Sequence, residues 1–402
     1  MKIGIDARFL THPQAGGFKT YSTYLIEALT RLDSANEYVL YLDRDAGRGP
    51  AWLAERNCTL RVIPGDTPLV GMPWREQVQL ARAAARDRLH LFHAPCLTAP
   101  LRLGCPLAVT IHDMIWHTPP AKPVRALGLK RALMARYYQT VPKLAVQRAA
   151  AVITVSQAAK RRIVAELGLQ PEQVTVTYEA AGPVFGRMTG ETAAARIRQR
   201  FGLERGYILA IGSADPRKNI ATLITAYGQL PQPLQARHPL VIVWTHSLLS
   251  TAMAHLVARL GLAERVRFVQ GVSDEELCGL YSLAALFVFP SREEGFGLPL
   301  LEAMTCGTPV IAAGNSSIPE IAGDAALLVD AEGAAEMAAA MTALLTGAAQ
   351  QRDLIARGYR RAAQFSWQRC AAETLDVYQA VYLAKRPPLP NRALSTGVWR
   401  RG

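Results

Sequence analysis

Residues 290–304 read Pro290-Ser291-Arg292-Glu293-Glu294-Gly295-Phe296-Gly297-Leu298-Pro299-Leu300-Leu301-Glu302-Ala303-Met304. They follow the run Leu283–Phe289, which is short, apolar, aromatic-rich and closed by a proline, as is typical of a buried strand. From Leu298 onward the residues favour a helix, and Pro299 stands near the first turn, where its missing N–H costs nothing. The stretch therefore predicts the order strand, glycine-containing loop, helix.

This order of elements suits an anion. Gly295 and Gly297 let backbone N–H groups approach a ligand closely, and the helix N-terminus adds a partial positive charge that suits phosphate. Glu294 stands in the loop and Glu302 in the helix, eight positions later. Ionised carboxylates only accept hydrogen bonds, so the pair suits the hydroxyls of a ribose or a hexose. The alternative is two solvated glutamates near a helix start, because acids favour the first turn.

Residues 294–312 read EGFGLPLLEAMTCGTPVIA, and this run resembles the signature of glycosyltransferase family 4, in which seven residues separate two glutamates. The resemblance extends over residues 1–384. It implies the GT-B fold, an α/β architecture of two Rossmann-like domains whose parallel sheets face an interdomain cleft. It also implies that the backbone of the loop and helix start binds a nucleotide-sugar donor, through Gly295, Phe296, Gly297 and Leu298.

The length and composition of the chain are those of a globular enzyme with more than one domain. A chain of 402 residues exceeds what one hydrophobic core usually supports. No apolar run reaches the roughly 18 to 20 residues that span a bilayer, and the N-terminus enters a strand pattern rather than a signal peptide, so we expect a cytoplasmic protein. The six cysteines include no Cys-x-x-Cys pair, so we expect neither a disulfide framework nor a metal cluster.

Much of the net charge of +13 lies in residues 114–165, which contain no acidic residue and ten basic ones: Lys122, Arg125, Lys130, Arg131, Arg136, Lys143, Arg148, Lys160, Arg161 and Arg162. Such a segment is either a basic solvated face or a surface that docks on anionic lipid or on a phosphorylated acceptor. Nearby aromatics suit an interface, and docking would place the protein at the inner face of the plasma membrane. Nucleic acid is not an expected partner, because no helix-turn-helix, finger or aromatic-basic platform occurs.

The first half of the chain alternates strand-like and helical segments, which predicts an α/β domain with a parallel sheet. Gly16 and Gly17 follow its first strand and precede a helical pattern. Backbone donors there could meet a phosphate or a sugar, although a plain turn explains the pair as well. In the family, a Gly-Gly in this first loop closes over the donor, and Gly16 and Gly17 match it.

His112 ends the predicted strand 107–111, and ligands of such sheets lie beyond the carboxyl ends of the strands. A histidine there can donate to a sugar hydroxyl or transfer a proton near neutral pH, and the alternative is a structural histidine. Asp113 follows directly. Members of the family carry His-Asp at this strand end, and the resemblance implies that His112 reaches the donor sugar.

Arg217 and Lys218 follow the predicted strand 207–211 and a glycine-containing loop. Arginine as a fork and lysine as a compact charge could together neutralise a diphosphate, whereas an exposed basic pair is the alternative. The run Gly212-Ser213-Ala214-Asp215-Pro216-Arg217-Lys218-Asn219 matches the family's Gly-x-x-x-Pro-Arg-Lys-Asn, whose basic residues hold the leaving nucleoside diphosphate.

These observations predict a division of the chain into four parts. Residues 1–187 form an N-terminal, acceptor-side domain and residues 188–366 a C-terminal, donor-side domain. Residues 367–385 form a helix that crosses back, and residues 386–402, rich in Pro, Arg and Gly, form a disordered tail. The family commonly has Asn-Gly at the exit from the first domain, where this chain has Ala181-Gly182, so any contact by that asparagine is absent.

On this hypothesis the chain is a retaining hexosyltransferase, with mannose favoured as the sugar, which builds cell-surface polysaccharide on a glycan or lipid-linked acceptor. Glu302 accepts hydrogen bonds from the ribose, Glu294 from a sugar hydroxyl, and His112 steadies the sugar. Arg217 and Lys218 take up charge on the diphosphate without a metal or other cofactor. Two alternatives are a donor-binding partner subunit that does not catalyse, and an epimerase or phosphorylase on the same fold.

Overall fold

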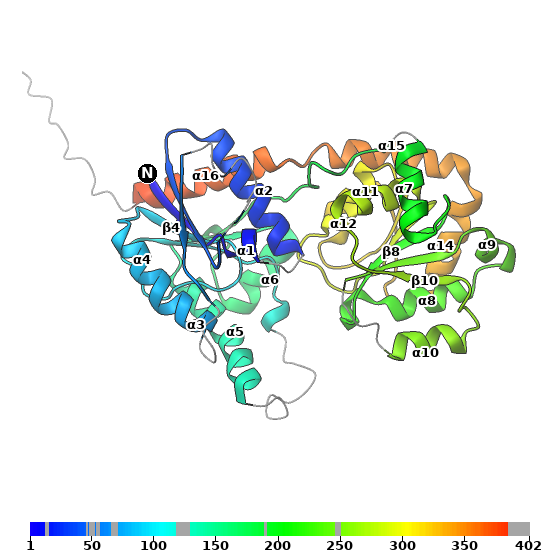
Figure 1. Cartoon of the computed structure of the whole chain (residues 1–402), viewed down its shortest axis with the longest axis horizontal. Coiled ribbons are helices and arrows are strands. Elements are labelled where there is room, and N and C mark those ends of the chain that lie inside the picture. The colour runs from blue at the N-terminus through cyan, green and yellow to red at the C-terminus, as the bar shows by residue number, and fades with distance from the viewer. Residues whose placement is uncertain are drawn as a thin grey trace, which may run out of the picture.

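Two sheets, each entirely parallel, form the framework of the protein. The structure, a computed structural model, describes residues 1–12, 16–45, 47, 53, 57–65, 71–117, 129–188, 191–245 and 251–384. Helices cover both faces of each sheet (Figure 1), as the near-continuous apolar strands require. We call each sheet with its helices the first lobe and the second lobe. The predicted GT-B architecture is confirmed.

The sheet of the first lobe has the order β3-β2-β1-β4-β5-β6-β7. This order reverses direction beside β1, as in doubly wound nucleotide-binding folds, so loops at the carboxyl ends of β1 and β4 border a crevice. Its strands are β1 (Lys2–Ile5), β2 (Glu37–Leu42), β3 (Cys58–Val62), β4 (Leu91–Ala94), β5 (Leu107–Thr110), β6 (Ala151–Thr154) and β7 (Val174–Val176).

The sheet of the second lobe repeats the design with the order β10-β9-β8-β11-β12-β13, and its reversal lies between β8 and β11. The loops that carry residues 213–219 and 290–297 follow these two central strands. The strands are β8 (Ile208–Gly212), β9 (Leu240–Trp244), β10 (Val266–Val269), β11 (Leu286–Phe289), β12 (Val310–Ala313) and β13 (Ala326–Val329).

The helices of the first lobe connect its strands, because neighbouring parallel strands require crossover connections. They are α1 (Arg8–Thr11), α2 (Gly17–Leu32), α3 (Gly71–Trp74), the π-helical turn η2 (Arg75–Leu80), α4 (Ala81–Arg86), the 3-10 turn η3 (Ile115–His117), α5 (Leu129–Arg148), α6 (Gln157–Leu167) and the 3-10 turn η5 (Pro171–Gln173).

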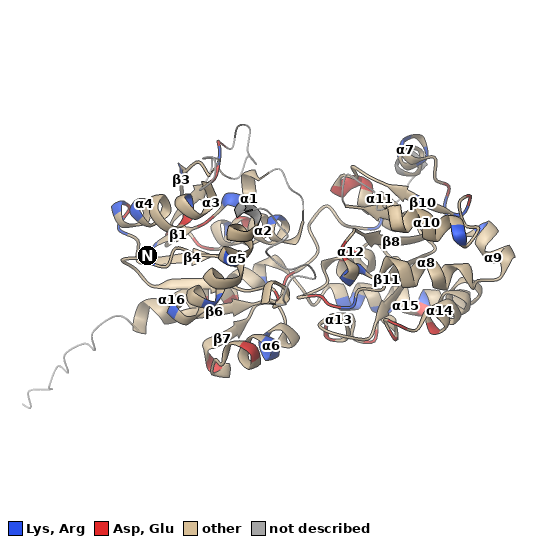
Figure 2. Ribbon diagram, turned by 90° about the horizontal axis from the view of Figure 1, so that it is seen from below, with Lys and Arg blue, Asp and Glu red and all other residues tan. Residues whose placement is uncertain are grey.

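The second lobe has the 3-10 turn η6 (Pro216–Lys218) and the helices α7 (Glu191–Phe201), α8 (Ile220–Gly228), α9 (Gln232–Arg237), α10 (Thr251–Arg259), α11 (Asp274–Leu283), α12 (Leu298–Thr305), α13 (Ile318–Ala322), α14 (Ala334–Thr346) and α15 (Ala348–Ala362). Ser273 caps α11, whose first turn carries three acids (Figure 2), so these acids serve the helix start.

Two sequence-based expectations need comment. The strand expected over 283–289 begins only at Leu286, because Leu283 ends α11; an apolar run does not by itself separate a buried helix end from a strand. The tail expected over 386–402 lies outside the described residues, as do Lys122 and Arg125 of the basic segment. None of the described helices is long and apolar enough to cross a membrane.

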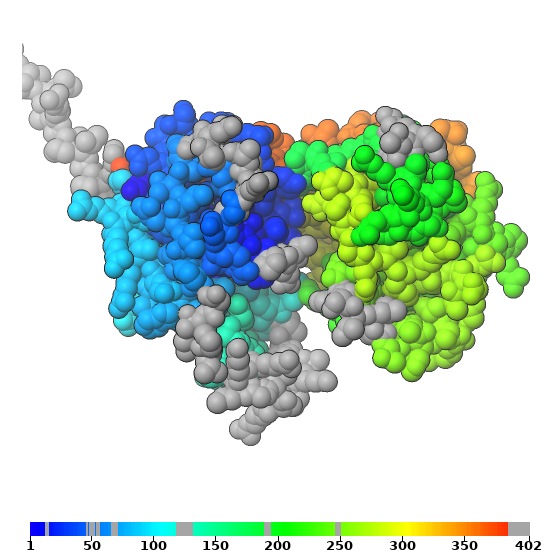
Figure 3. Space-filling model, in the orientation of Figure 1, coloured from blue at the N-terminus to red at the C-terminus, as the bar shows by residue number. Residues whose placement is uncertain are grey.

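The last described helix, α16 (Trp367–Ala384), leaves the second lobe and runs back across the first (Figure 1). It packs on α2, β4 and β6, and the indole N–H of Trp367 donates to the carbonyl of Ala181 at 3.2 Å. Between the lobes the surface is hollowed (Figure 3), and the loops after β5, β8 and β11 lie where the lobes meet.

Candidate active site

The loop between β11 and α12 holds the most unusual backbone of the second lobe. Gly297 is the N-cap of α12 with a φ of +108°, a conformation that only glycine adopts without strain, and no side chain caps this helix. Pro299 occupies the first turn, as expected. The helix therefore starts with backbone groups turned toward the loop rather than toward a capping side chain, which suits an anionic ligand.

The side chains of Ser317 and Asn219 hold this loop in place by hydrogen bonds to its backbone. Ser317 donates to the carbonyls of Glu294, at 3.0 Å, and Phe296, at 2.9 Å. Asn219, itself in a left-handed conformation, donates to the carbonyl of Pro290 at 3.0 Å and so joins the loop after β8 to the loop after β11. Asn219 ends the Pro-Arg-Lys-Asn run, which was the available signal; Ser317 carried none.

Lys218 and Glu294, from these two loops, form an ion pair. The Lys218 Nζ lies 2.7 Å from Glu294 Oε1 and 5.6 Å from the centre of the Phe289 ring. The side chains are 28% and 16% exposed, so both remain within reach of a ligand. The structure thus brings together two of the residues predicted for the site, one as a cation and one as an acceptor.

Arg217 lies in the same turn but has another partner. Its side chain folds back on Asp215, with Nε 3.1 Å from Oδ1, and Asp215 also accepts the Arg217 backbone N–H. The Arg217 carbonyl accepts the N–H of Arg292 at 2.8 Å. Contact with a diphosphate therefore requires Arg217 to leave Asp215, which its exposure allows.

Glu302 lies deeper, on the first full turn of α12. Its carboxyl is almost wholly buried and accepts the hydroxyl of Tyr281 at 3.2 Å. Burial raises the pKa of Glu302 to about 8, with smaller contributions from Asp274 and Glu179. Burial thus favours the protonated carboxyl, whereas hydrogen bonds from a bound diol would favour loss of that proton.

The first lobe contributes His112, which is buried directly beyond β5. Its Nδ1 lies 3.0 Å from Glu179 Oε1 and its Nε2 lies 3.0 Å from the carbonyl of Pro95. Both ring nitrogens are thus engaged within the protein, so either expected role, a hydrogen bond to a sugar hydroxyl or the transfer of a proton, requires His112 to exchange one of these contacts. No sequence pattern pointed to Glu179, which lies 67 positions from His112 in the chain.

Gly16 and Gly17 begin α2 at the mouth of the first lobe. Gly16 is the N-cap with a φ of +141°, and a methyl group at either glycine would meet open space. The neighbouring Phe18 packs edge-on against the ring of His112, with ring centres 5.0 Å apart. The preceding residues 13–15 lie outside the described residues.

The two lobes touch at Gly295. A Cβ atom there would lie 2.2 Å from the backbone oxygen of His112, so this position accepts only glycine. Ser156 donates to the Gly295 carbonyl at 2.7 Å while its oxygen also accepts the Ala159 N–H. Ser156 therefore caps α6 and also joins the two lobes. Phe296 is buried and packs beside Tyr178 and Phe365, and Leu298 is buried too.

A carboxylate of the second lobe occupies the N-terminus of α6. Glu320 accepts the backbone N–H groups of Gln157, at 2.7 Å, and Ala158, at 2.9 Å, as well as the hydroxyl of Tyr178. These contacts satisfy the helix start across the lobe boundary. Arg162, one of the ten basic residues of the charged segment, pairs with Glu293 beside them.

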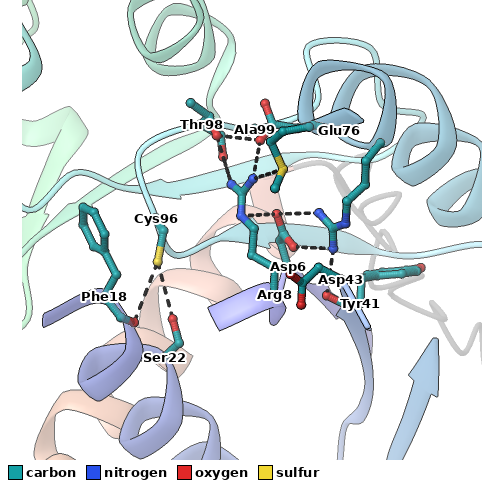
Figure 4. A network of polar contacts seen from close by, with 12 residues as sticks. Asp6, Arg8, Phe18, Ser22, Tyr41, Asp43, Glu76, Cys96, Thr98 and Ala99 are labelled. Atoms are coloured by element: carbon teal, nitrogen blue, oxygen red, sulfur yellow. Dashed lines mark hydrogen bonds and ion pairs between the residues drawn. The ribbon is translucent and has the colours of Figure 1, made fainter. Parts of the chain in front are cut away.

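Behind the cleft face of the first lobe lies a cluster of buried charges (Figure 4). Asp6 lies 3.2 Å from Arg8 and 3.1 Å from Arg75, and Arg8 lies 3.0 Å from Glu76. Thr98 also donates to Glu76. All four charged side chains are at most 6% exposed, so the cluster is structural. Among the described residues, no group of three or more His, Cys, Asp or Glu side chains could hold a metal ion.

Two family models match the chain. "Glycosyltransferase Family 4" matches residues 15–180 and "Glycosyl transferases group 1" matches residues 193–361. The chain is similar to the O-antigen chain mannosyltransferase B of Escherichia coli, 32% identical over 300 residues that cover 74% of this chain and 76% of that one. It is also 32% identical to the serotype-specific mannosyltransferase WbdA of Escherichia coli over 55% of this chain, but spans only 28% of that longer protein.

Solved structures of the same fold include sucrose-phosphate synthase from Thermosynechococcus elongatus, with a TM-score of 0.73 and 22% identity over 95% of this chain and 99% of that one. Anabaena HepE, solved in complex with UDP and glucose, gives a TM-score of 0.68 and 20% identity over 94% and 99%. The matching family models and curated relatives are described as transferases, which favours a transferase over the epimerase or phosphorylase alternative.

Proposed function

The chain belongs to glycosyltransferase family 4, and from this premise we propose that it is a retaining hexosyltransferase. It transfers the sugar of a nucleoside-diphosphate sugar, with mannose favoured, to a glycan or lipid-linked acceptor in the synthesis of a cell-surface polysaccharide. Mannose and the polysaccharide rest on the likeness to O-antigen chain mannosyltransferase B.

The observation that carries the proposal is the Lys218–Glu294 pair beside the uncapped start of α12. A diphosphate attracts the Lys218 ammonium away from Glu294, because it offers more negative charge and more acceptor oxygens. The released Glu294 carboxylate then accepts hydroxyl groups of the sugar. Both members of the ion pair thus contact the donor when it binds. Before binding, each residue neutralises the charge of the other.

Departure of the diphosphate needs positive charge that is already in position. Lys218, Arg217 once it leaves Asp215, and the N-terminus of α12 supply that charge. The backbone of Gly16 and Gly17 faces the donor from the first lobe. The sugar leaves and the acceptor enters on one face, with the departing phosphate as base. Asp113 is not given the role of nucleophile, because its Oδ1 accepts the Ile115 N–H at 2.9 Å.

The nucleoside is held through its ribose by Glu302. Two hydroxyl donors on this carboxyl lower its pKa from about 8, so ribose binding and loss of the Glu302 proton are coupled. We assign the acceptor to residues 1–187 and the donor to residues 188–366, with residues 367–385 closing the first domain.

A place at the inner face of the plasma membrane belongs to the proposal. Helix α5 exposes Leu133 and Arg136 to solvent, and Leu133 is 60% exposed. An apolar side chain next to basic ones suits a surface of anionic lipid, where a lipid-linked acceptor would be presented. Flotation with vesicles of phosphatidylcholine and phosphatidylglycerol tests this point separately from transfer.

A donor screen tests the proposed function. The protein is titrated with nucleoside diphosphates and their hexose conjugates, and its melting temperature is recorded, since a ligand bound only by the folded state stabilises it. We expect one nucleotide to raise the melting temperature, and radiolabelled sugar from its mannose conjugate to appear in a lipid-extractable or glycan product. Absence of any shift contradicts the donor site. A shift without transfer to any acceptor supports the non-catalytic partner subunit.

A further inference from the structure

The ring of His112 is flanked by two atoms that can only accept hydrogen bonds. Glu179 Oε1 lies 3.0 Å from Nδ1, and the carbonyl oxygen of Pro95 lies 3.0 Å from Nε2. A neutral imidazole carries one N–H, so its other nitrogen would direct a lone pair at an oxygen lone pair. With Glu179 as a carboxylate, only the doubly protonated ring satisfies both contacts. The arrangement is therefore that of an imidazolium with its own counter-ion.

We propose that Glu179 is a positioning residue that keeps His112 permanently protonated, so that the first lobe presents a fixed positive charge at the point where it meets the donor loop. The role that we give this charge in sugar transfer rests on the proposed function, whereas the presence of the charge does not. The charge sits immediately behind the contact of the His112 backbone with Gly295. A nucleoside-diphosphate sugar in that loop meets a cation rather than a group that exchanges protons.

Because the pair is buried, the protonation of His112 depends on Glu179. His112 and Glu179 are 9% and 3% exposed, so neither charge is hydrated well enough to persist alone. Burial by itself lowers the pKa of His112, but hydrogen bonds to Cys96 and Glu179, together with the charge of Glu179, raise it to about 10. Removing the carboxylate charge leaves the burial effect, which favours the neutral ring.

Other titratable groups face this pair from every neighbouring element. They are Cys96 beyond β4, His93 in β4, Tyr21 in α2, Asp113 next in the chain, Cys370 in α16 and Glu302 in α12. Burial and the charge of His112 lower the pKa of His93 to about 3, so His93 is neutral and bonds to Thr110 and Tyr378. Glu179 is the one carboxylate among these groups in direct contact with the His112 ring.

His117 provides a matched control within the same lobe. Its Nδ1 lies 2.9 Å from Glu166 Oε2, but both side chains are close to 30% exposed. The two histidines therefore share a partner type and a distance, and differ in burial. Glu166→Gln should leave transfer unchanged, whereas Glu179→Gln removes one buried charge while keeping an oxygen that can accept from Nδ1.

The first measurement is a pH titration of the full-length protein by NMR with isotope-labelled histidine, in the absence of any nucleotide. We expect the His112 signals to stay those of an imidazolium up to at least pH 8.5, and to titrate at or below about pH 6.5, the ordinary range of histidine, in Glu179→Gln. Wild-type signals that titrate near 6.5, or signals unchanged in Glu179→Gln, overturn the proposal. This outcome does not depend on finding the donor.

The second measurement is the pH dependence of kcat/KM for the donor identified by the screen. Dividing the value for Glu179→Gln by that of the wild type leaves only the part of the Glu302 titration that Glu179 itself influences, which is a smaller cause of the Glu302 pKa than burial. We expect the ratio to fall at least tenfold between pH 5.5 and pH 8, and the ratio for Glu166→Gln to stay flat. A pH-independent ratio for Glu179→Gln overturns the role of the charge in transfer. Failure of the proposed function shows as no transfer by any protein.

Discussion

The two lobes hold their charges at the cleft in different ways. In the first lobe, Asp6 and Arg75 are at most 1% exposed and belong to a closed network, and no ligand can replace their partners without unfolding the site. In the second lobe, Lys218 and Glu294 are partly exposed and hold one another across two loops. The buried network holds the conformation of the first lobe fixed. The exposed Lys218–Glu294 pair can instead replace its mutual contact with contacts to a ligand. The first lobe is therefore the rigid wall of the cleft and the second its adaptable one.

The largest effect is expected from breaking the buried network. Arg75→Met leaves Asp6 buried with one cation fewer, and loss of one partner of a buried pair costs about 3 to 5 kcal/mol in the free energy of unfolding. Arg61→Met is the matched control, because Arg61 pairs with Asp87 but is 48% exposed, and its loss costs under about 1 kcal/mol. Urea denaturation followed by tryptophan fluorescence measures both. Equal losses in the two variants would contradict the contrast.

Breaking the exposed Lys218–Glu294 pair should lower activity strongly and stability little. Lys218→Met removes a charge that meets the departing diphosphate, so we expect kcat to fall by about 10²- to 10³-fold while the free energy of unfolding changes by less than about 1 kcal/mol. Arg200→Met, which breaks an exposed pair with Glu276 in the same lobe, is the control. A stable Lys218→Met variant with undiminished transfer refutes the assignment.

The contact between the walls is tested by Gly295→Ala. The new methyl group lies 2.2 Å from the His112 oxygen, so the lobes must separate, and the donor loop moves relative to the first lobe. We expect transfer to fall about 10²-fold, as for misplacement by about 1 Å, and the radius of gyration from small-angle X-ray scattering to increase. Gly104→Ala, whose methyl group meets open space, should change neither. Full activity in Gly295→Ala would show that the contact is dispensable.

The smallest effect concerns Glu302, which belongs to the adaptable wall but is buried. Its pKa is raised from 4.5 in the unfolded chain to about 8 in the folded protein, so the folded state favours the proton. That stabilisation is complete below about pH 4.5 and is lost as pH rises through 8. Glu302→Gln keeps a neutral group at every pH, so we expect its advantage over the wild type to grow as pH rises from about 4.5 to 8.

Thermal denaturation of Glu302→Gln and wild type between pH 5 and pH 8.5 checks this expectation. Glu373→Gln, at a more exposed surface pair, provides the baseline. An advantage that shrinks with rising pH would mean that Glu302 is ionised in the empty protein.

The sequence was sufficient for the architecture and for the order strand, glycine loop and helix around residues 290–304, because both rest on local patterns. Alternating strands and helices predicted two parallel sheets, and a glycine loop before Pro299 predicted a helix start that the structure confirms. The partners of the predicted residues were not readable. Glu179 and Glu320 meet His112 and α6 across 67 and more than 160 positions of sequence, and no periodicity links them.

The placement of Arg217 shows the same limit. Its neighbour Asp215 was visible in the sequence, but an arginine in a short turn can fold back on that acid or extend into a cleft, and only packing decides between these conformations. The predicted start of the strand at Leu283 was wrong for a related reason, because a buried helix end and a buried strand are both apolar.

Helix α16 has a consequence for how the protein is made. The strands of the first lobe leave the ribosome before those of the second, yet α2, the helix that α16 covers, stays without this cover until residues 367–384 have been synthesised. The second lobe is complete with α15, directly before α16. Domains usually fold in the order of their synthesis, but here the lobe that starts first finishes last, and its uncovered apolar face must be kept from aggregation throughout translation of the other.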